Sequence, residues 1–357
     1  MSNSPIRITN DELFSPEIND VVETQQALNR EIGAVSDQPW LIRVIYANWF
    51  YLAVCAGLGG FVGGLVLEPF FDDSAAAEGE IQIGAILIFP AVAGAIGLFL
   101  GAAEGLMCRN GSRAVINGTV GAAVGFFGGL VALIPTGIVF TIMQGIAISL
   151  WKNPVEGEMP TGLALIVFMM GRAAAWSIAA IPAGIGQGIA LKERKVIMNG
   201  ALGGVLGGLL GGFLFDPISF VFITADGEAI YSRLIGFLCI GVFVGLFVGL
   251  IEGWTKTAWL VMKKGPLAGK QFILYKDTTI LGSSPKAEIY LFKDDAIEPK
   301  HAVLYNRGGR FEIEDCDTPD GTYINGIPLQ GRKPLSAGDQ IVLGKTVLEF
   351  SLRESDK

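Results

Sequence analysis

The sequence predicts two parts of different fold class: an all-α polytopic membrane domain of six helices in three hairpin repeats, followed by an all-β sandwich. Three observations support this division. Apolar runs of about 20 residues recur between positions 44 and 262. Near position 265 the hydrophobic period changes from that of a helix to the two-residue alternation of a strand. The mean hydropathy is +0.51 although both flanks are polar, so one chain meets two solvents.

Six segments are long enough to cross a bilayer core of about 30 Å, which requires roughly 20 apolar residues per helix. Within a membrane domain at 41–264 we expect spans at about 44–67, 83–107, 114–134, 172–191, 196–218 and 234–262. The stretch 135–170 is apolar, but its two apolar parts are each short for a span. We interpret it as an interfacial or re-entrant segment on the outer side.

Glycine spacing predicts close helix packing in this domain. Most of the 49 glycines lie inside the apolar runs at three- and four-residue spacing, as in the segment 56–64. Small-residue stripes let helix backbones approach each other in a bilayer, where the hydrophobic effect does not drive association. We favour this packing role over the alternative that glycine merely fills apolar sequence.

Charge predicts the orientation. The basic residues Arg43, Arg109, Arg113, Lys192, Arg194, Lys195, Lys263 and Lys264 fall on one side of the spans, and most acidic loop residues fall on the other, with Lys152 as an exception. Basic loops stay in the cytoplasm. We therefore expect a multi-pass protein of the inner (cytoplasmic) membrane with both termini cytoplasmic. Residues 1–40 would form a cytoplasmic arm, partly disordered or a short helix.

An internal repeat supports the six-helix count. The segment from Arg113 to Gly121 resembles that from Lys195 to Gly203. A Glu-Gly or Gln-Gly dipeptide also recurs near the cytoplasmic ends of the second, fourth and sixth helices: Glu104-Gly105, Gln187-Gly188 and Glu252-Gly253. The simplest account is three copies of a glycine-rich helical hairpin.

Charged residues near the ends of the spans are expected at the membrane interface rather than in a transport path. These residues are Glu104, Arg172, Asp216, Arg233 and Glu252. An ionisable group in the bilayer core is costly and usually functional, but no predicted span carries a charge at its midpoint. Because Asp216 and Arg233 face each other across a short outer loop, we predict that they form an ion pair that fixes the last hairpin.

The segment 265–357 carries short β-branched and aromatic runs separated by Gly, Asp, Pro and Asn turns, the pattern of an all-β sandwich. Five motifs follow in order: Thr279 to Ser283, Glu298 to Ala302, Phe311 to Asp315, Asp320 to Gly326, and Leu335 to Gly344. In order and spacing they resemble the forkhead-associated (FHA) domain. The glycine-rich region before them is similar, less specifically, to membrane regions joined to FHA domains in uncharacterised prokaryotic proteins.

The resemblance implies a loop site for phosphothreonine peptides, with Arg, Ser, Thr or Ser, and Asn at set positions. This sequence has Ser283, Glu298, Pro319 and Asp320 at those positions, and Lys300 is the cation that remains. A phosphate dianion prefers a guanidinium fork and hydroxyl donors. We therefore predict a degenerate pocket whose peptide binding does not depend on phosphate.

The resemblance also assigns residues to two roles. The expected peptide-binding loops contain Ser283, Ser284, Glu298, Lys300, Thr318, Asp320 and Thr322. The expected structural motif positions are Gly282, His301, Gly321, Asn325 and Gly326. His301, the only histidine of the chain, is interpreted as a residue that holds loops together rather than as a catalyst or metal ligand.

Composition argues against several function classes. The four cysteines are scattered, without a CxxC pair, so neither a disulfide frame nor a metal site is indicated. The net charge of −8 offers no basic face for nucleic acid, and no nucleophile–base set or cofactor motif can be assembled. The prediction is a non-enzymatic membrane scaffold or adaptor that contacts lipid and a protein or peptide partner, with homo-oligomers possible. The alternative is a channel or transporter regulated by the FHA-like domain.

Overall fold

The computed structural model describes residues 39–71, 83–151, 160–222 and 230–353. The chain divides into a helical unit, Val44–Lys256, and a second unit that contains Thr257–Lys357. The expected N-terminal arm lies almost wholly outside the described residues, as do most acidic residues of the predicted outer loops. Each unit is described by itself.

Six helices in the described ranges are long and apolar enough to cross a membrane. A short helix, α3 (Trp40–Ile45), precedes them. The six long helices are α4 (Asn48–Leu67), α6 (Ile83–Met107), α7 (Gly111–Leu150), α8 (Leu163–Leu191), α9 (Arg194–Phe222) and α10 (Ile230–Thr255). A 3-10 turn, η1 (Glu68–Phe70), ends α4. This confirms the predicted polytopic all-α region and its helix count.

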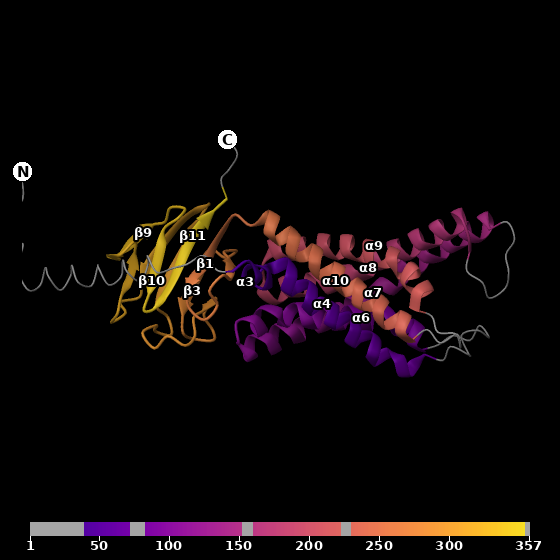
Figure 1. Ribbon diagram of the computed structural model, residues 1–357, viewed down its shortest axis with the longest axis horizontal. Helices are drawn as coiled ribbons and strands as arrows, with labels where there is room; N and C mark the ends of the chain where they lie inside the picture. The colour runs from indigo at the N-terminus through magenta and orange to yellow at the C-terminus, as the bar shows by residue number, and fades with distance from the viewer. Residues whose placement is uncertain (1–38, 72–82, 152–159, 223–229, 354–357) are drawn as a thin grey trace, which may run out of the picture. The chain divides into compact units, whose positions relative to one another are not determined.

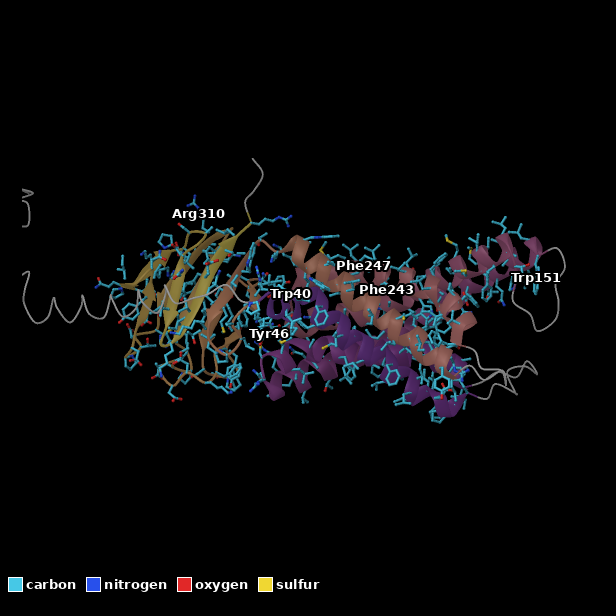
Figure 2. All side chains as sticks on the ribbon, viewed as in Figure 1. Trp40, Tyr46, Trp151, Phe243, Phe247 and Arg310 are labelled. Atoms are coloured by element: carbon cyan, nitrogen blue, oxygen red, sulfur yellow. The ribbon has the colours of Figure 1, made fainter. Side chains whose placement is uncertain are left out.

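The six long helices form a closed ring. Each packs beside the next in the chain, and α10 packs on α4, so the first and last helices are neighbours (Figure 1). The core of the ring is apolar and includes Leu52, Ile96, Trp176 and Phe237, all nearly without exposure. Phe243 and Phe247, in contrast, project half-buried from α10 (Figure 2).

Among the described helices, glycines allow the closest backbone approaches in three helix pairs. The pairs are α6 with α7, α8 with α9, and α10 with α4. A Cβ atom on Gly97 would lie 2.3 Å from the carbonyl oxygen of Gly121, and one on Gly184 would lie 2.0 Å from that of Gly200. No side chain fits at such positions. The α6–α7 and α8–α9 contacts therefore join consecutive predicted hairpins. The α10–α4 contact joins the last predicted hairpin to the first.

The segment 135–170, expected to be interfacial or re-entrant, is not a separate element in its described part, because α7 continues unbroken for 40 residues and α8 begins at Leu163. Pro135 lies inside this helix, next to Thr136. The Thr136 hydroxyl donates to the carbonyl oxygens of Ala132 (2.6 Å) and Leu133 (3.0 Å) in the turn that the proline disturbs.

The expected last span at 234–262 is also too long. Helix α10 ends at Thr255, and strand β1 (Ala258–Lys264) begins three residues later. The apolar run hides this change, but burial alternates along it: Ala258, Leu260 and Met262 are buried, whereas the residues between them are half-buried. The β domain therefore begins near residue 257 rather than at 265.

The second unit is a sandwich of two sheets, which confirms the predicted fold class. One sheet has the order β2-β1-β11-β10-β7-β8, and the other has the order β4-β3-β5-β6-β9. The strands after β1 are β2 (Gln271–Ile273), β3 (Thr278–Gly282), β4 (Ile289–Tyr290), β5 (Ala302–Arg307), β6 (Arg310–Asp315), β7 (Thr322–Ile324), β8 (Ile327–Pro328), β9 (Arg332–Pro334), β10 (Gln340–Leu343) and β11 (Thr346–Leu352).

Both sheets contribute to one apolar core. Leu260, Leu304, Ile313, Ile341 and Phe350 have no exposed surface. Strand β1 pairs with β11 on one side and β2 on the other, so it is internal to its sheet. The sheet order thus depends on residues that precede position 265.

Candidate functional site

Three loops of the β-sandwich are tied together by backbone hydrogen bonds. Ser283 N–H donates to Glu298 O (2.9 Å), Ser284 N–H donates to Pro299 O (3.3 Å), and Cys316 N–H donates to His301 O (2.9 Å). These bonds join the loops after β3, before β5 and after β6. They gather the residues that the sequence assigned to a peptide-binding site.

Gly282 permits this close approach. A Cβ atom at this position would lie 2.2 Å from the carbonyl oxygen of Pro299. Any side chain would push the loop before β5 away from β3. The glycine is therefore required by the distance between two loops, and its backbone torsions are not unusual.

His301 lies at the centre of the loops and has no exposed surface. Its Nδ1 accepts the Glu298 N–H (3.2 Å), so Nε2 carries the proton in the neutral ring and faces Gly321 O at 3.2 Å. The Thr318 Oγ1 is 3.3 Å from the same Nε2. One ring thus contacts two loops on its two edges.

Asp315, at the end of β6, accepts the hydrogen bonds that shape the third loop. Its carboxylate receives Thr318 N–H (2.9 Å), the Thr318 hydroxyl (3.0 Å) and the Thr322 hydroxyl (2.6 Å). Burial alone would raise the pKa of Asp315, but these donors outweigh it and hold the pKa below its ordinary value. The sequence analysis assigned no role to Asp315. The spacing Asp, Thr at +3 and Thr at +7 is the signal that marks it.

The predicted peptide-contacting residues divide by exposure. Glu298, Lys300 and Asp320 are exposed, whereas Ser283, Ser284 and Thr318 are half-buried. Thr322 is 1% exposed and faces inward, so its side chain does not line the loop surface. The hydroxyl of the third loop comes from Thr318, because Pro319 has no side-chain donor.

Asn325 and Gly326 form the turn between β7 and β8, and both adopt positive φ angles of 54° and 79°. The Asn325 amide donates to Asp339 (2.8 Å) and accepts Gln340 N–H (2.8 Å). Asparagine tolerates this left-handed backbone better than most residues. The described contacts of Asn325 therefore connect the turn to the start of β10.

In the helical unit, the predicted ion pair between Asp216 and Arg233 is wrong. Asp216 pairs instead with Arg172 (Nε to Oδ1, 3.0 Å), and Arg233 pairs with Glu68. The first pair joins α8 to α9, and the second joins α10 to η1 at the end of α4. The Arg172 guanidinium also lies over the ring of Phe215, 5.0 Å from its centre. Helix packing across the ring, rather than the short outer loop, selects the partners.

The opposite ends of the helices carry a second set of polar contacts. Glu252 is 3% exposed and accepts a hydrogen bond from Asn48 Nδ2 at 3.3 Å. Asn199 Nδ2 donates to Thr255 Oγ1 at 2.7 Å. Glu104 is half-buried. Glu252 therefore lies within the bundle end rather than on its surface, and its bond again joins α10 to α4.

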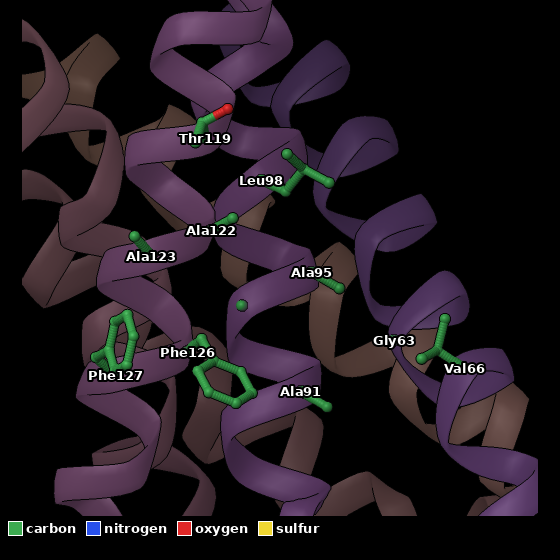
Figure 3. Close-up of a pocket in the computed structure, with 11 residues that line it drawn as sticks. Gly63, Val66, Ala91, Ala95, Leu98, Thr119, Ala122, Ala123, Phe126 and Phe127 are labelled. Atoms are coloured by element: carbon green, nitrogen blue, oxygen red, sulfur yellow. The ribbon is translucent and has the colours of Figure 1, made fainter.

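An apolar groove of about 510 Å³ lies on the helical unit between α4, α6 and α7 (Figure 3). Its floor is formed by small residues of α6, and Phe126 and Phe127 of α7 form one wall. The lining residues are Gly63, Val66, Ala91, Gly94, Ala95, Leu98, Thr119, Ala122, Ala123, Phe126 and Phe127. None of them is ionisable, so this groove suits a hydrocarbon rather than a polar solute.

Comparison with known proteins addresses the β domain. A family profile described as "Inner membrane component of T3SS, cytoplasmic domain" matches residues 262–354. An oxoglutarate dehydrogenase inhibitor of Corynebacterium jeikeium is 39% identical over 102 residues, which cover 29% of this chain and 67% of that protein. The glycogen accumulation regulator GarA of Mycolicibacterium smegmatis is 37% identical over 94 residues, 26% of this chain and 58% of that protein.

A solved structure aligns with the same region. The FHA domain of the CT664 protein from Chlamydia trachomatis is 26% identical and is covered completely, over 28% of this chain, with a TM-score of 0.26. The chain spans 67% and 58% of the lengths of the two curated relatives. None of these matches covers more than a third of this chain.

The two-sheet sandwich with its interlocked loops defines a protein-interaction module. The module is a forkhead-associated domain, and the chain belongs to the FHA-domain proteins. In this member the FHA domain follows an apolar region of six long helices within the described residues.

Proposed function

We propose that the protein is a membrane-anchored adaptor whose FHA domain binds a protein segment on the cytoplasmic side without requiring phosphothreonine. The helical region would serve as the anchor, and the loops around His301 would contact the partner. The proposal assigns no catalytic step to the chain.

The charge at the loop surface is the observation that carries the proposal. Glu298 and Asp320 are exposed carboxylates at positions where the family supplies a serine and an asparagine, and Ser283 stands in place of arginine. Each carboxylate within ~4 Å of a phosphate would repel it by about 1 kcal/mol in water and about 4 kcal/mol in a partly buried setting. Lys300 alone does not offset two such charges and a missing guanidinium.

The hydroxyl groups offer little compensation. The Thr318 hydroxyl already donates to Asp315, and the Thr322 hydroxyl is buried and does the same. A ligand phosphate would have to displace a bond to a carboxylate to recruit Thr318. A peptide that presents a lysine or arginine to Glu298 and Asp320 fits this surface better than an anion.

Anchoring in the inner membrane with the FHA domain in the cytoplasm is supported by the basic residues at the ends of α6, α8 and α10. The matching family is described as the cytoplasmic domain of an inner membrane component, which agrees with this orientation. The channel alternative gains no support from the groove, since its described lining carries no ionisable group.

The test compares two forms of the full chain, purified in lipid nanodiscs. The native chain should bind matched phosphothreonine and threonine peptides from a random library equally weakly. A variant with Ser283→Arg, Glu298→Ser and Asp320→Asn should gain preference for the phosphorylated set. Strong phosphothreonine selectivity of the native chain would refute the proposal.

A further inference from the structure

Helix α7 is longer than a bilayer requires. Its 40 residues extend for about 60 Å at 1.5 Å per residue, twice the ~30 Å of a hydrocarbon core. Figure 1 shows α7 and α8 continuing together past the ends of the other helices in the helical unit, and Trp151 stands at the tip of this extension (Figure 2). Part of α7 therefore lies outside the hydrocarbon.

The ion pair between Arg172 and Asp216 marks where the extension begins. The Arg172 guanidinium lies 5.7 Å from the centre of the Phe140 ring, so the ion pair is level with Phe140. Charged groups favour the membrane interface over its core. Ten residues of α7, or about 15 Å, continue beyond this level. They carry no charged side chain.

One side of this extension is packed on α8. Phe140 contacts Phe168 with ring centres 5.5 Å apart, Met143 lies against Gly171, and Ala147 has no exposed surface. Thr136 is likewise buried. The spacing 136, 140, 143 and 147 defines a helix face, and α8 covers it.

The opposite side is apolar and uncovered. We define the exposed face of α7 as Ile134, Ile138, Thr141, Ile142, Gly145 and Ile148. The four isoleucines are between 54% and 73% exposed, and Thr141 and Gly145 are exposed as well. The face continues towards the bilayer through Phe127 and Val131, which are 64% and 75% exposed.

Glycine contacts distinguish this face from the packed helix pairs of the helical unit. Within the bundle, glycines such as Gly97 and Gly245 are met at under 2.5 Å by a neighbouring helix backbone when a Cβ is added. Gly145 and the adjacent Gly137 meet nothing within 4 Å. Gly145 lies between isoleucines one turn away, which makes a shallow depression between two ridges. Such a surface accepts another helix at close range.

We propose that the exposed face of α7 binds the same face of a second copy of this chain, giving a two-fold symmetric dimer. The apolar side chains of the face and its continuation expose on the order of 500 Å² per chain, so a pair would bury about 1,000 Å², the size at which specific association begins. Exclusion of water contributes only for the part beyond the level of Phe140, and the part inside the bilayer contributes by close packing. The face offers no charge and almost no hydrogen-bonding group, and a self-complementary apolar ridge matches that chemistry. This inference goes beyond the adaptor function and does not depend on the FHA site.

The test uses the full chain in liposomes at low protein-to-lipid ratio, with the four native cysteines replaced by alanine. Thr141→Cys should form a cross-linked dimer under mild oxidation. Two controls should not: Ala147→Cys, which faces α8, and Val115→Cys, which is 68% exposed but lies outside the face. Equal cross-linking of all three variants, or none through Thr141→Cys, overturns the proposal.

A second measurement tests the affinity. Energy transfer between labelled copies should report a dimer whose dissociation constant rises about tenfold or more in Gly145→Leu. The matched control is Gly253→Leu, at another helical glycine that meets nothing within 4 Å, and it should leave the dimer unchanged. An unchanged dimer in Gly145→Leu refutes the assignment. The proposal is also refuted if the chain is monomeric and Thr141→Cys does not react with a membrane-impermeant maleimide, because lipid then covers the face.

Discussion

Replacing Gly245 by alanine should separate the first and last helices of the ring. A Cβ atom on Gly245 would lie 2.1 Å from the carbonyl oxygen and 2.5 Å from the carbonyl carbon of Leu52, where ordinary contact begins at 3.4 Å. Helices α4 and α10 must therefore move apart by about 1 Å at this point. Gly241 and Gly249 meet α4 as closely one turn to either side, so a small tilt does not relieve the clash.

The expected cost is about 1–3 kcal/mol, the range for overpacking in a well-packed core. Unfolding by sodium dodecyl sulfate in mixed micelles, followed by circular dichroism, measures it. The control is Gly253→Ala on the same helix, where nothing lies within 4 Å and alanine gains up to about 1 kcal/mol of helix propensity. Equal stability of the two variants within about 0.5 kcal/mol would refute the packing argument.

Three further predictions concern ion pairs, domain limits and pH. In a double-mutant cycle, Asp216→Asn should be coupled to Arg172→Gln by about 1–3 kcal/mol and additive with Arg233→Gln, because the 3.0 Å contact joins Asp216 to Arg172; coupling to Arg233 instead would contradict the observed partners. A fragment 265–357 should fail to fold, whereas 256–357 should give a cooperative thermal transition, since β1 pairs with both β2 and β11; a folded short fragment would show that β1 is dispensable. The pKa of Asp315 is held below its ordinary 3.8 in the folded state, so its contribution to stability is complete above that pH and is lost as the pH falls through the lower folded value; in urea titrations of 256–357, Asp315→Asn should flatten the acid limb below about pH 4, and an unaltered slope would argue against its role.

The sequence predicted the number of long helices because each contains about 20 consecutive apolar residues, and it predicted the sandwich because strand alternation and five ordered motifs agree. The predicted helix lengths were inaccurate where an apolar run continues from the bilayer into another solvent, or from a helix into a strand. The bilayer thickness was taken as an upper limit for α7, although its apolar sequence continues to Leu150. The run before Lys264 is apolar throughout, so its sequence fits a helix and a strand equally well. Only the alternating burial of its side chains reveals β1.

The site was predictable to the extent that its residues lie in ordered motifs. The sequence named Gly282, His301, Thr318 and the loop carboxylates as candidates, but it gave no role to Asp315. The threonines three and seven residues after Asp315 are the signal that could have identified it, but the motif comparison did not consider that spacing. The partners of Arg172 and Arg233 were missed because they depend on the closure of the ring, which a count of spans does not contain.

The contact between α4 and α10 has a consequence for biogenesis. The first long helix, α4, finds its backbone-matched neighbour only late in synthesis, since Asn48 contacts Glu252, 204 residues further along the chain. Until then its glycine face has lipid or a translocon component in place of a protein partner. A chain terminated before α10 would leave that face of α4 without its partner helix. When α10 has been synthesised, the whole FHA domain still remains to be translated. The last helix of the anchor is therefore translated before the interaction module.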